Sequence, residues 1–194
     1  KQVRIDIANR LRNKGYYFFS PEYIEYLADS TITKGAIALK LDLAANIPSW
    51  AMKSYKVGRI TTVINRNSGT GTPDTFRTDR GTVIQMQPSH LRRKLIPECI
   101  AFRTGKTFSV RDMNRTQTYL SRLGIFSEID ISAIPDTLAP EPTLDIDITC
   151  RFDKPLEATV EVNASSKSNS YIGPGVVLGL TNKNLFGGGE QFSV

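Results

Sequence analysis

The chain has 194 residues and a formal net charge of +6, with 40% hydrophobic and 23% charged residues. These values favour one or two globular domains. No run of about 18 apolar residues occurs, which excludes a membrane-spanning helix. The basic excess is spread along the chain, whereas a nucleic-acid binder usually concentrates it in one patch.

The first 48 residues are predicted to form the C-terminal part of an α/β module. Three apolar residues recur there at helical spacing: Val3, Ile7 and Leu11. Gly15 is expected to end this helix, because glycine adopts the left-handed conformation of helix C-termini. The aromatic-rich segment 16–29 predicts a strand interrupted near Pro21, and the alternation at 36–43 predicts a second strand after a turn at Gly35. We expect the front half of this module, and a leader, to lie upstream.

Residues 53–153 are predicted to form a complete module with the order β-α-α-β-β. Its first strand is expected over 55–64, where β-forming residues predominate. A polar insertion follows over 65–88 and is expected to add one short strand at 82–87. A short helix over 88–96 is then predicted from the Pro-Ser start.

The next helix of this module is expected to begin at Ser109, whose hydroxyl can accept a hydrogen bond from an amide of the first turn. Asp112 stands three residues on, as in a capping box, and Phe108 and Met113 have the spacing of a hydrophobic staple. Gly124 is expected to end the helix in the same way as Gly15.

Two antiparallel strands are predicted to follow this helix. Residues 144–152 alternate between apolar and polar side chains, as in a half-buried strand, and 125–134 is the predicted partner. We expect 144–152 to be central in the sheet, antiparallel to 125–134 and parallel to 55–64. The segment 125–134 would then lie at a sheet edge.

The helix end and the second hairpin strand occur twice. Leu120 and Gly124 lie 109 residues after Leu11 and Gly15, and the alternation at 145–152 lies at the same offset from 36–43. A single offset that aligns two different elements indicates two copies of one module.

Beyond residue 153 the pattern changes to long alternating segments. Apolar residues at 156–164 alternate with polar ones, and those at 172–180 alternate with glycines and a threonine. One apolar and one polar face on long strands suit the wall of a transmembrane β-barrel. An ordinary antiparallel hairpin is the alternative.

No catalytic, cofactor or metal site is predicted. Gly105-Lys106-Thr107 lacks the glycine that a phosphate-binding loop needs five positions earlier, where Ile100 stands. The only histidine, His90, has no evident partner. Cys99 and Cys150 alone cannot hold zinc, and whether they form a disulfide stays open. We therefore expect no enzymatic activity and no cofactor.

A glycine-rich motif follows the second tail segment and comprises Asn182, Asn184, Leu185, Phe186, Gly187, Gly188, Gly189 and Glu190. It resembles the turn near the start of the barrel in the bacterial surface antigen family (BamA/TamA-like). Residues 53–153 resemble a POTRA domain of that family, and 108–126 resemble its helix with a Leu-Gly-Ile-Phe ending. The resemblance covers nearly the whole chain, although the insertion at 65–88 departs from a minimal POTRA domain.

This resemblance implies an α+β fold with tandem POTRA-like modules at 1–48 and 53–153, followed by the first antiparallel strands of an outer-membrane β-barrel at 154–194. It also implies a Gram-negative outer-membrane protein that assembles or translocates other proteins, with residues 1–153 in the periplasm. Expected partners are unfolded outer-membrane proteins or other exported clients, accessory periplasmic proteins or lipoproteins, and the outer membrane itself.

An open sheet edge suits this function, because an extended client can add to it as a strand. The predicted client edge comprises Glu128, Ile129, Asp130, Ile131, Ser132, Ala133 and Ile134. Ile129, Ile131 and Ala133 are expected to face the helices. Glu128, Asp130 and Ser132 are expected to face water. Main-chain bonding at such an edge tolerates different client sequences.

The competing hypothesis is a soluble α/β binding module, either for nucleic acid or as a cell-envelope scaffold. The pI of 9.4 favours nucleic acid, but a KH domain needs a Gly-x-x-Gly loop, and 101–109 contains only Gly105. The barrel-like tail argues against a scaffold. We therefore expect no nucleic-acid partner.

Overall fold

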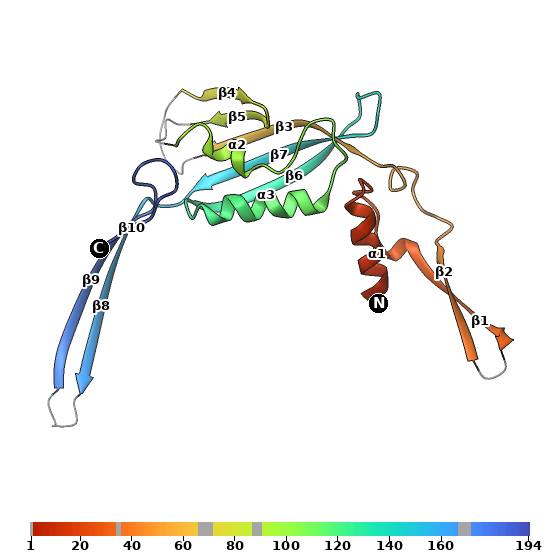
Figure 1. The fold of residues 1–194 in the computed structure, drawn as a ribbon, viewed down its shortest axis with the longest axis horizontal. Helices are drawn as coiled ribbons and strands as arrows, with labels where there is room; N and C mark the ends of the chain where they lie inside the picture. The colour runs from red at the N-terminus through yellow and green to blue at the C-terminus, as the bar shows by residue number, and fades with distance from the viewer. Residues whose placement is uncertain (1, 34–35, 66–71, 87–90, 167–171) are drawn as a thin grey trace. The chain divides into compact units, whose positions relative to one another are not determined.

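The computed structural model describes residues 2–33, 36–65, 72–86, 91–166 and 172–194 (Figure 1). The described strands form three sheets, with the orders β1-β2, β4-β5-β3-β7-β6 and β10-β9-β8. The fold is therefore mixed α and β, as the sequence predicts. The chain divides into two compact units, Lys1–Ile60 with Ala101–Thr116 and Ser132–Asp147, and Thr61–Ile100 with Gln117–Ile131 and Ile148–Val194. None of the described helices is long and apolar enough to cross a membrane.

Helix α1 (Gln2–Arg12) ends as predicted at Gly15, which has a φ of 96°. The Gly15 amide donates to the Arg12 carbonyl at 3.4 Å, and the Tyr16 amide donates to the Leu11 carbonyl at 3.2 Å. This pair of bonds is the Schellman motif, which satisfies carbonyls at a helix end. The glycine at this position is therefore required by the backbone conformation.

Strands β1 (Ile24–Thr33) and β2 (Ala36–Leu43) pair antiparallel, with Ile24 opposite Leu43. The predicted strand over 16–29 is wrong in its first half. Residues 16–19 form hydrogen-bonded turns, and the 3-10 turn η1 (Pro21–Tyr23) follows them, because proline cannot donate to a ladder. The predicted turn at Gly35 lies outside the described residues.

The largest sheet has the spatial order β4 (Asp74–Thr78), β5 (Gly81–Gln85), β3 (Lys56–Asn65), β7 (Thr143–Phe152) and β6 (Phe126–Asp136). The Lys56 amide donates to the Pro142 carbonyl, and the Arg59 amide donates to Asp145 Oδ1. The residue numbers of the bonded partners increase in the same direction along both strands, so β3 and β7 are parallel.

Strand β6 runs in the opposite direction to β7. The Asp153 amide donates to the Ile125 carbonyl at 2.8 Å, and the Ser132 hydroxyl donates to the Asp147 carbonyl at 3.4 Å. The prediction that β7 is central, parallel to β3 and antiparallel to β6, is confirmed. Its inward side chains are all buried: Leu144, Ile146, Ile148, Cys150 and Phe152.

The insertion adds two strands to the sheet, whereas the sequence predicted one. Strands β4 and β5 pair antiparallel, and β5 pairs parallel with β3. Strand β4 could not be predicted from its hydrophobic pattern, because Phe76 is its only large apolar residue. Residues 88–90 of the predicted short helix lie outside the described residues, and 91–94 are not helical. The observed helix α2 is Leu95–Cys99.

Helix α3 (Val110–Arg122) lies alongside strands β6 and β7 (Figure 1). Its first turn is capped by Asn13, whose Oδ1 accepts hydrogen bonds from the Arg111 amide at 2.8 Å and from the Ser109 hydroxyl at 3.2 Å. The helix begins directly after Ser109, as predicted. The prediction that the Ser109 hydroxyl accepts the cap bond is wrong, because the side-chain oxygen of Asn13 accepts it instead. Gly124 follows the helix with a φ of 65°.

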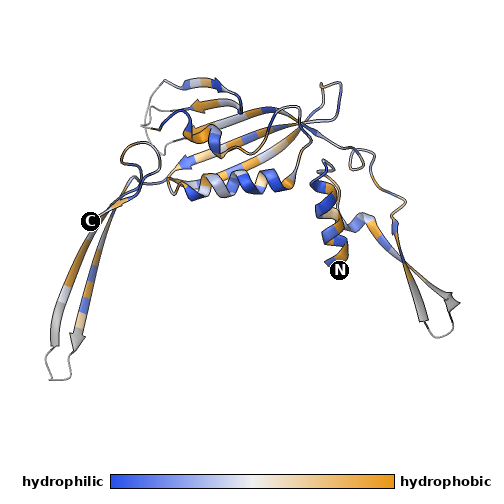
Figure 2. Cartoon of the chain, viewed as in Figure 1, coloured by the Kyte–Doolittle hydropathy of each residue, from blue (hydrophilic) through white to orange (hydrophobic). Residues whose placement is uncertain are grey.

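Strands β8 (Leu156–Ser166) and β9 (Ile172–Asn182) form a long antiparallel hairpin, in which Leu156 lies opposite Asn182. Strand β10 (Phe192–Ser193) pairs with the end of β9. Hydrophobic and hydrophilic positions alternate along β8, whereas β9 is mostly hydrophobic or glycine (Figure 2). The two long strands predicted from the alternation are therefore confirmed.

Candidate functional site: an open sheet edge and a glycine-rich loop

All seven residues of the predicted client edge lie in β6, which is terminal in its sheet. A terminal strand has a sheet partner on one side only, so the backbone amides and carbonyls of its other side are available to a further strand. Strand β4 is the opposite terminal strand, but it is only 5 residues long, against 11 for β6. The longer edge offers the longer ladder.

The side chains of β6 divide between two faces. Ile131 is buried, Ile129 and Ala133 are half-buried, and Glu128 and Asp130 are exposed. This division agrees with the sequence pattern. The backbone of the edge is thus flanked by acidic groups on its polar face, and these groups keep the open strand soluble without blocking its main-chain bonds.

The predicted client edge is bounded by an exposed ion pair at one end and by a proline at the other. Glu128 forms an ion pair with Arg151 at 3.2 Å, but both groups are exposed, so the pair contributes little. Pro135 lies near the other end of β6 and lacks an amide hydrogen. Ile134, just before it, is half exposed. The continuous stretch of potential donors therefore lies before Pro135.

A hollow of about 530 Å³ lies next to the end of β6. Aromatic and proline residues dominate its lining, which comprises Phe18, Trp50, Lys53, Tyr55, Pro135, Asp136, Thr137, Ala139, Pro140, Glu141 and Pro142. The Phe18 ring packs edge-on against both Trp50 and Tyr55. Sequence reasoning missed this hollow, because its two walls come from segments about 80 residues apart, although both walls are rich in aromatic or proline residues.

Polar side chains hold the glycine-rich loop that follows β9. Asn182 Oδ1 accepts a hydrogen bond from the Asn184 amide at 3.1 Å, and Asn184 Oδ1 accepts one from the Gly189 amide at 3.1 Å. Glu190 Oε2 accepts a bond from the Gly188 amide at 2.9 Å. Gly189 has a φ of 78°, which favours glycine. The motif is therefore a folded loop, with each polar residue bonded to a backbone amide.

The loop also contacts the segment before α2 and the end of α3. The Arg92 amide donates to the Gly187 carbonyl at 2.9 Å, and an Arg92 guanidinium nitrogen lies 3.3 Å from Glu190 Oε1. A Cβ added at Gly189 would lie 3.3 Å from the Leu123 carbonyl oxygen. Close backbone approach thus explains this glycine. Arg92 could not be identified from sequence patterns, because its partner lies about 100 residues away.

Charged groups reinforce the base of the hairpin. Lys183 Nζ lies 2.6 Å from Asp153 and 3.3 Å from Glu157. The hydrogen bond from Lys183, with a second from the Lys154 amide, lowers the pKa of Asp153. The hydrogen bond to Asp153 in turn raises the pKa of Lys183. Hydrogen bonds from backbone amides, together with the charge of Arg92, lower the pKa of Glu190.

Cys99 and Cys150 are free, buried thiols. Burial, with a smaller contribution from Glu98, raises the pKa of Cys99 to about 11. Burial, with a smaller contribution from Cys99, raises the pKa of Cys150 to about 12. Both thiols are therefore protonated at neutral pH and unreactive as nucleophiles. The part of the chain that the structure describes holds no group of three or more His, Cys, Asp or Glu residues placed to bind a metal ion.

The hairpin β8–β9 carries an apolar face that nothing in the described structure covers. Opposed pairs on this face include Val160 with Leu178 and Val162 with Val176. All four side chains are more than half exposed. Exposed apolar residues that form a continuous strip indicate a surface for a membrane or another protein.

No family model matches the chain, and no curated protein matches its sequence. Among solved structures, it is similar to BamA from Haemophilus ducreyi lacking POTRA domains 1-3, with a TM-score of 0.53 and 13% sequence identity. The chain has a BamA-like fold. The match covers 99% of this chain but only 29% of that BamA chain, so the chain spans less than a third of its structural neighbour.

Proposed function

We propose that the chain is the POTRA region and first barrel segment of an outer-membrane protein assembly or translocation factor, and that it binds clients or accessory proteins by strand addition at β6. Residues 1–48 and 53–153 are then POTRA modules in the periplasm, and 154–194 begin the barrel. The observation that carries the proposal is the combination, within a BamA-like fold, of an open sheet edge and a long hairpin with an uncovered apolar face.

The chemistry of the edge suits clients of varied sequence. Main-chain hydrogen bonds supply the affinity in strand addition, and side-chain pockets supply selectivity. The β6 edge offers main-chain donors and acceptors. Its exposed acidic face disfavours pairing with a second copy, because like charges would then meet. Binding of this kind needs no covalent step.

Photo-cross-linking tests the proposed edge. A benzophenone side chain placed at Asp130 in β6 is expected to form adducts with an unfolded outer-membrane protein diluted from urea. The matched control is Asp147, an acidic position in the central strand β7, which has sheet partners on both sides. Adducts at position 130 and none at 147 support strand addition.

Two outcomes would contradict the proposal. Equal adducts at positions 130 and 147 would indicate general adhesion to the polar face, and a lack of adducts at 130 would remove the edge as a binding site. Binding of RNA that weakens steeply with salt would instead favour the nucleic-acid hypothesis.

A further inference from the structure

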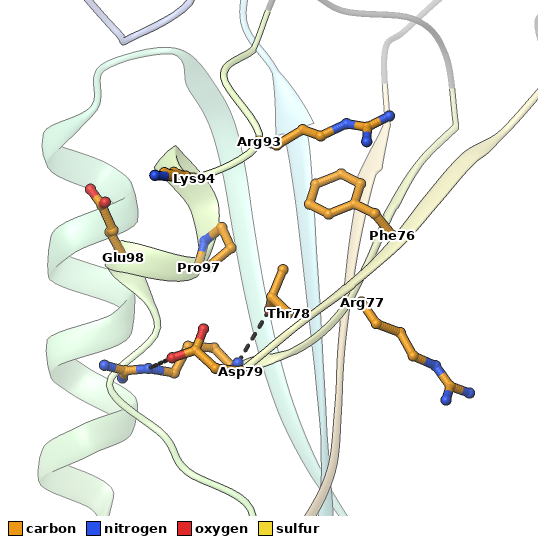
Figure 3. Close-up of a pocket in the computed structure, with 9 residues that line it drawn as sticks. Phe76, Arg77, Thr78, Asp79, Arg93, Lys94, Pro97 and Glu98 are labelled. Carbon is orange, nitrogen blue, oxygen red and sulfur yellow. Dashed lines mark hydrogen bonds and ion pairs between the residues drawn. The ribbon is translucent and has the colours of Figure 1, made fainter.

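The inserted hairpin β4–β5 and the segment around α2 enclose a second hollow, of about 470 Å³ (Figure 3). This volume is within the range of about 300–1,000 Å³ that is usual for small-molecule sites. Its lining is basic and partly apolar, and comprises Phe76, Arg77, Thr78, Asp79, Arg80, Arg93, Lys94, Pro97 and Glu98. The hollow depends on the insertion, which is the feature of this chain that departs from a minimal POTRA domain.

Two cations at this hollow are available to an anion. The Arg93 guanidinium carbon lies 5.4 Å from the centre of the Phe76 ring, and Arg93 Nη2 lies 3.3 Å from Asp74 Oδ2. The Arg93 side chain is 71% exposed, so this ion pair is weak and exchangeable. Lys94 has no ion-pair partner among the described residues. Arginine on an aromatic face keeps its planar donors directed outward, which suits phosphate oxygens.

The other charges of the lining are accounted for. Arg80 donates to the Ile100 carbonyl at 2.7 Å and to Asp79 at 3.3 Å, so it is held in place and neutralises that carboxylate. Glu98 is the carboxylate of the lining that opposes an anion. Arg93 and Lys94 together outweigh it, and its removal should therefore strengthen anion binding.

The cations also lie beside the end of the apolar hairpin. Arg92, which directly precedes Arg93, donates its amide to the Gly187 carbonyl in the loop that follows β9. The uncovered apolar face of β8–β9 ends at this loop. A basic site next to the end of an apolar surface matches the order of a lipid molecule, in which the charged headgroup follows the acyl chains.

We propose that this hollow binds the phosphate of an anionic phospholipid headgroup. Arg93 donates to the phosphate oxygens, Lys94 adds positive charge from the other side of the lining (Figure 3), and Phe76 and Pro97 provide the apolar wall for the glycerol. The lipid as the source of the phosphate rests on the proposed membrane placement of the hairpin, whereas the recognition of phosphate rests on the hollow alone.

Calorimetric titration of the whole chain tests this proposal with a monomeric lipid. Dihexanoyl phosphatidylglycerol, below its micelle concentration, is the probe, and dihexanoyl phosphatidylcholine and inorganic phosphate are the comparisons. We expect phosphatidylglycerol to bind at least about tenfold more tightly than either, since charge and apolar contact act together. Inorganic phosphate that binds as tightly as the lipid would overturn the headgroup assignment, and no binding of phosphatidylglycerol would overturn the site.

Four glutamine variants sharpen the result. Arg93→Gln and Lys94→Gln should each weaken lipid binding by about fivefold, as expected for one basic residue at an anionic surface. Glu98→Gln should strengthen it. Arg77→Gln is the matched control, because the Arg77 guanidinium points away from Phe76 and Lys94 (Figure 3), and it should leave binding unchanged. An equal loss in Arg77→Gln would reduce the effect to net charge and overturn the proposal.

The two proposals fail separately. Binding of a monomeric lipid requires neither a barrel nor a client, and client cross-linking at β6 does not involve the hollow. Loss of cross-linking with intact lipid binding would contradict strand addition alone, and the reverse result would contradict the lipid site alone.

Discussion

Strand β7 and strand β8 of the β8–β9 hairpin have the same alternation of apolar and polar residues but opposite environments. The inward residues of β7 are at most 8% exposed, whereas Val162 and Leu178 of the hairpin are 75% and 72% exposed. Alternation therefore predicts a strand and its apolar face, but it does not predict what covers that face. The inward face of β7 is covered by the surrounding core, whereas the described residues provide no cover for the apolar face of β8–β9.

The largest expected effect separates the covered strand from the uncovered one. Ile148→Ala should lower the free energy of unfolding by about 2–5 kcal/mol, because it leaves a cavity in a packed core. Leu178→Ala should change it by no more than about 0.5 kcal/mol in water, as for other exposed positions. Urea unfolding of both variants measures the difference. Similar losses would show that the hairpin face is covered after all.

A smaller effect on the free energy of unfolding is expected from two glycines that end helices. Gly15 has close neighbours, whereas Gly124 has none within 4 Å of an added Cβ. A Cβ at Gly15 would lie 2.9 Å from Thr107 Cγ2 and 3.0 Å from the Tyr55 carbonyl oxygen, whereas a Cβ at Gly124 would meet nothing within 4 Å. Gly124→Val should cost more than about 1 kcal/mol through conformation alone. Gly15→Ala should cost more than Gly124→Ala, because steric contact adds to the same conformational term.

Thermal unfolding of the three variants and of Gly124→Asn tests this prediction. Asparagine tolerates the left-handed conformation, so it should recover part of the stability that valine removes. Unchanged stability in Gly124→Val would count against the proposed helix boundary.

The features shared by the two proposed modules show how much of the fold could be predicted. Gly15 and Gly124 both end helices, and β2 and β7 both pair antiparallel with the strand before them, because these features depend on local pattern. The first hairpin strands do not share the offset, since β1 starts at Ile24 and β6 at Phe126. The start of β1 depends on the turns and the proline within residues 16–23, which no periodicity describes.

The contacts of the candidate sites were largely beyond sequence reasoning. The edge position of β6 followed from strand order, and the glycine-rich motif was visible as such. The partners of these elements were not visible: Asn13 at the start of α3, and Arg92 at the loop, act across about 100 residues of sequence. Hollows formed by two such distant segments leave no local signature.

The glycine-rich loop that follows β9 and contacts Arg92 should respond to acid. Glu190 has its pKa lowered from an ordinary value of 4.5 by amide hydrogen bonds and Arg92. Because the folded pKa lies below the unfolded one, this contribution is fully present above about pH 4.5 and is lost as the pH falls through the folded pKa. The protection of the Gly188 amide, which is its exchange rate relative to the intrinsic rate at the same pH, should therefore fall below that pH.

The matched variants for this effect are Glu190→Gln and Glu128→Gln. The first should remove the loss of protection at Gly188 at low pH, and the second, on the β6 edge, should leave that loss unchanged. A pH profile that survives in Glu190→Gln would assign the effect to another group.

The self-association of the chain tests the account most directly, because an uncovered apolar face should recruit a second copy in water. Val160 and Leu178 lie opposite each other, so Val160→Glu with Leu178→Lys replaces one apolar pair by complementary charges and retains the hairpin. In light scattering, the unmodified chain is predicted to form dimers or larger species. The double variant and the chain truncated after Asp153 are predicted to be monomers. If all three are equally monomeric, with 156–182 still ordered, the hairpin needs no external cover and the barrel interpretation is wrong.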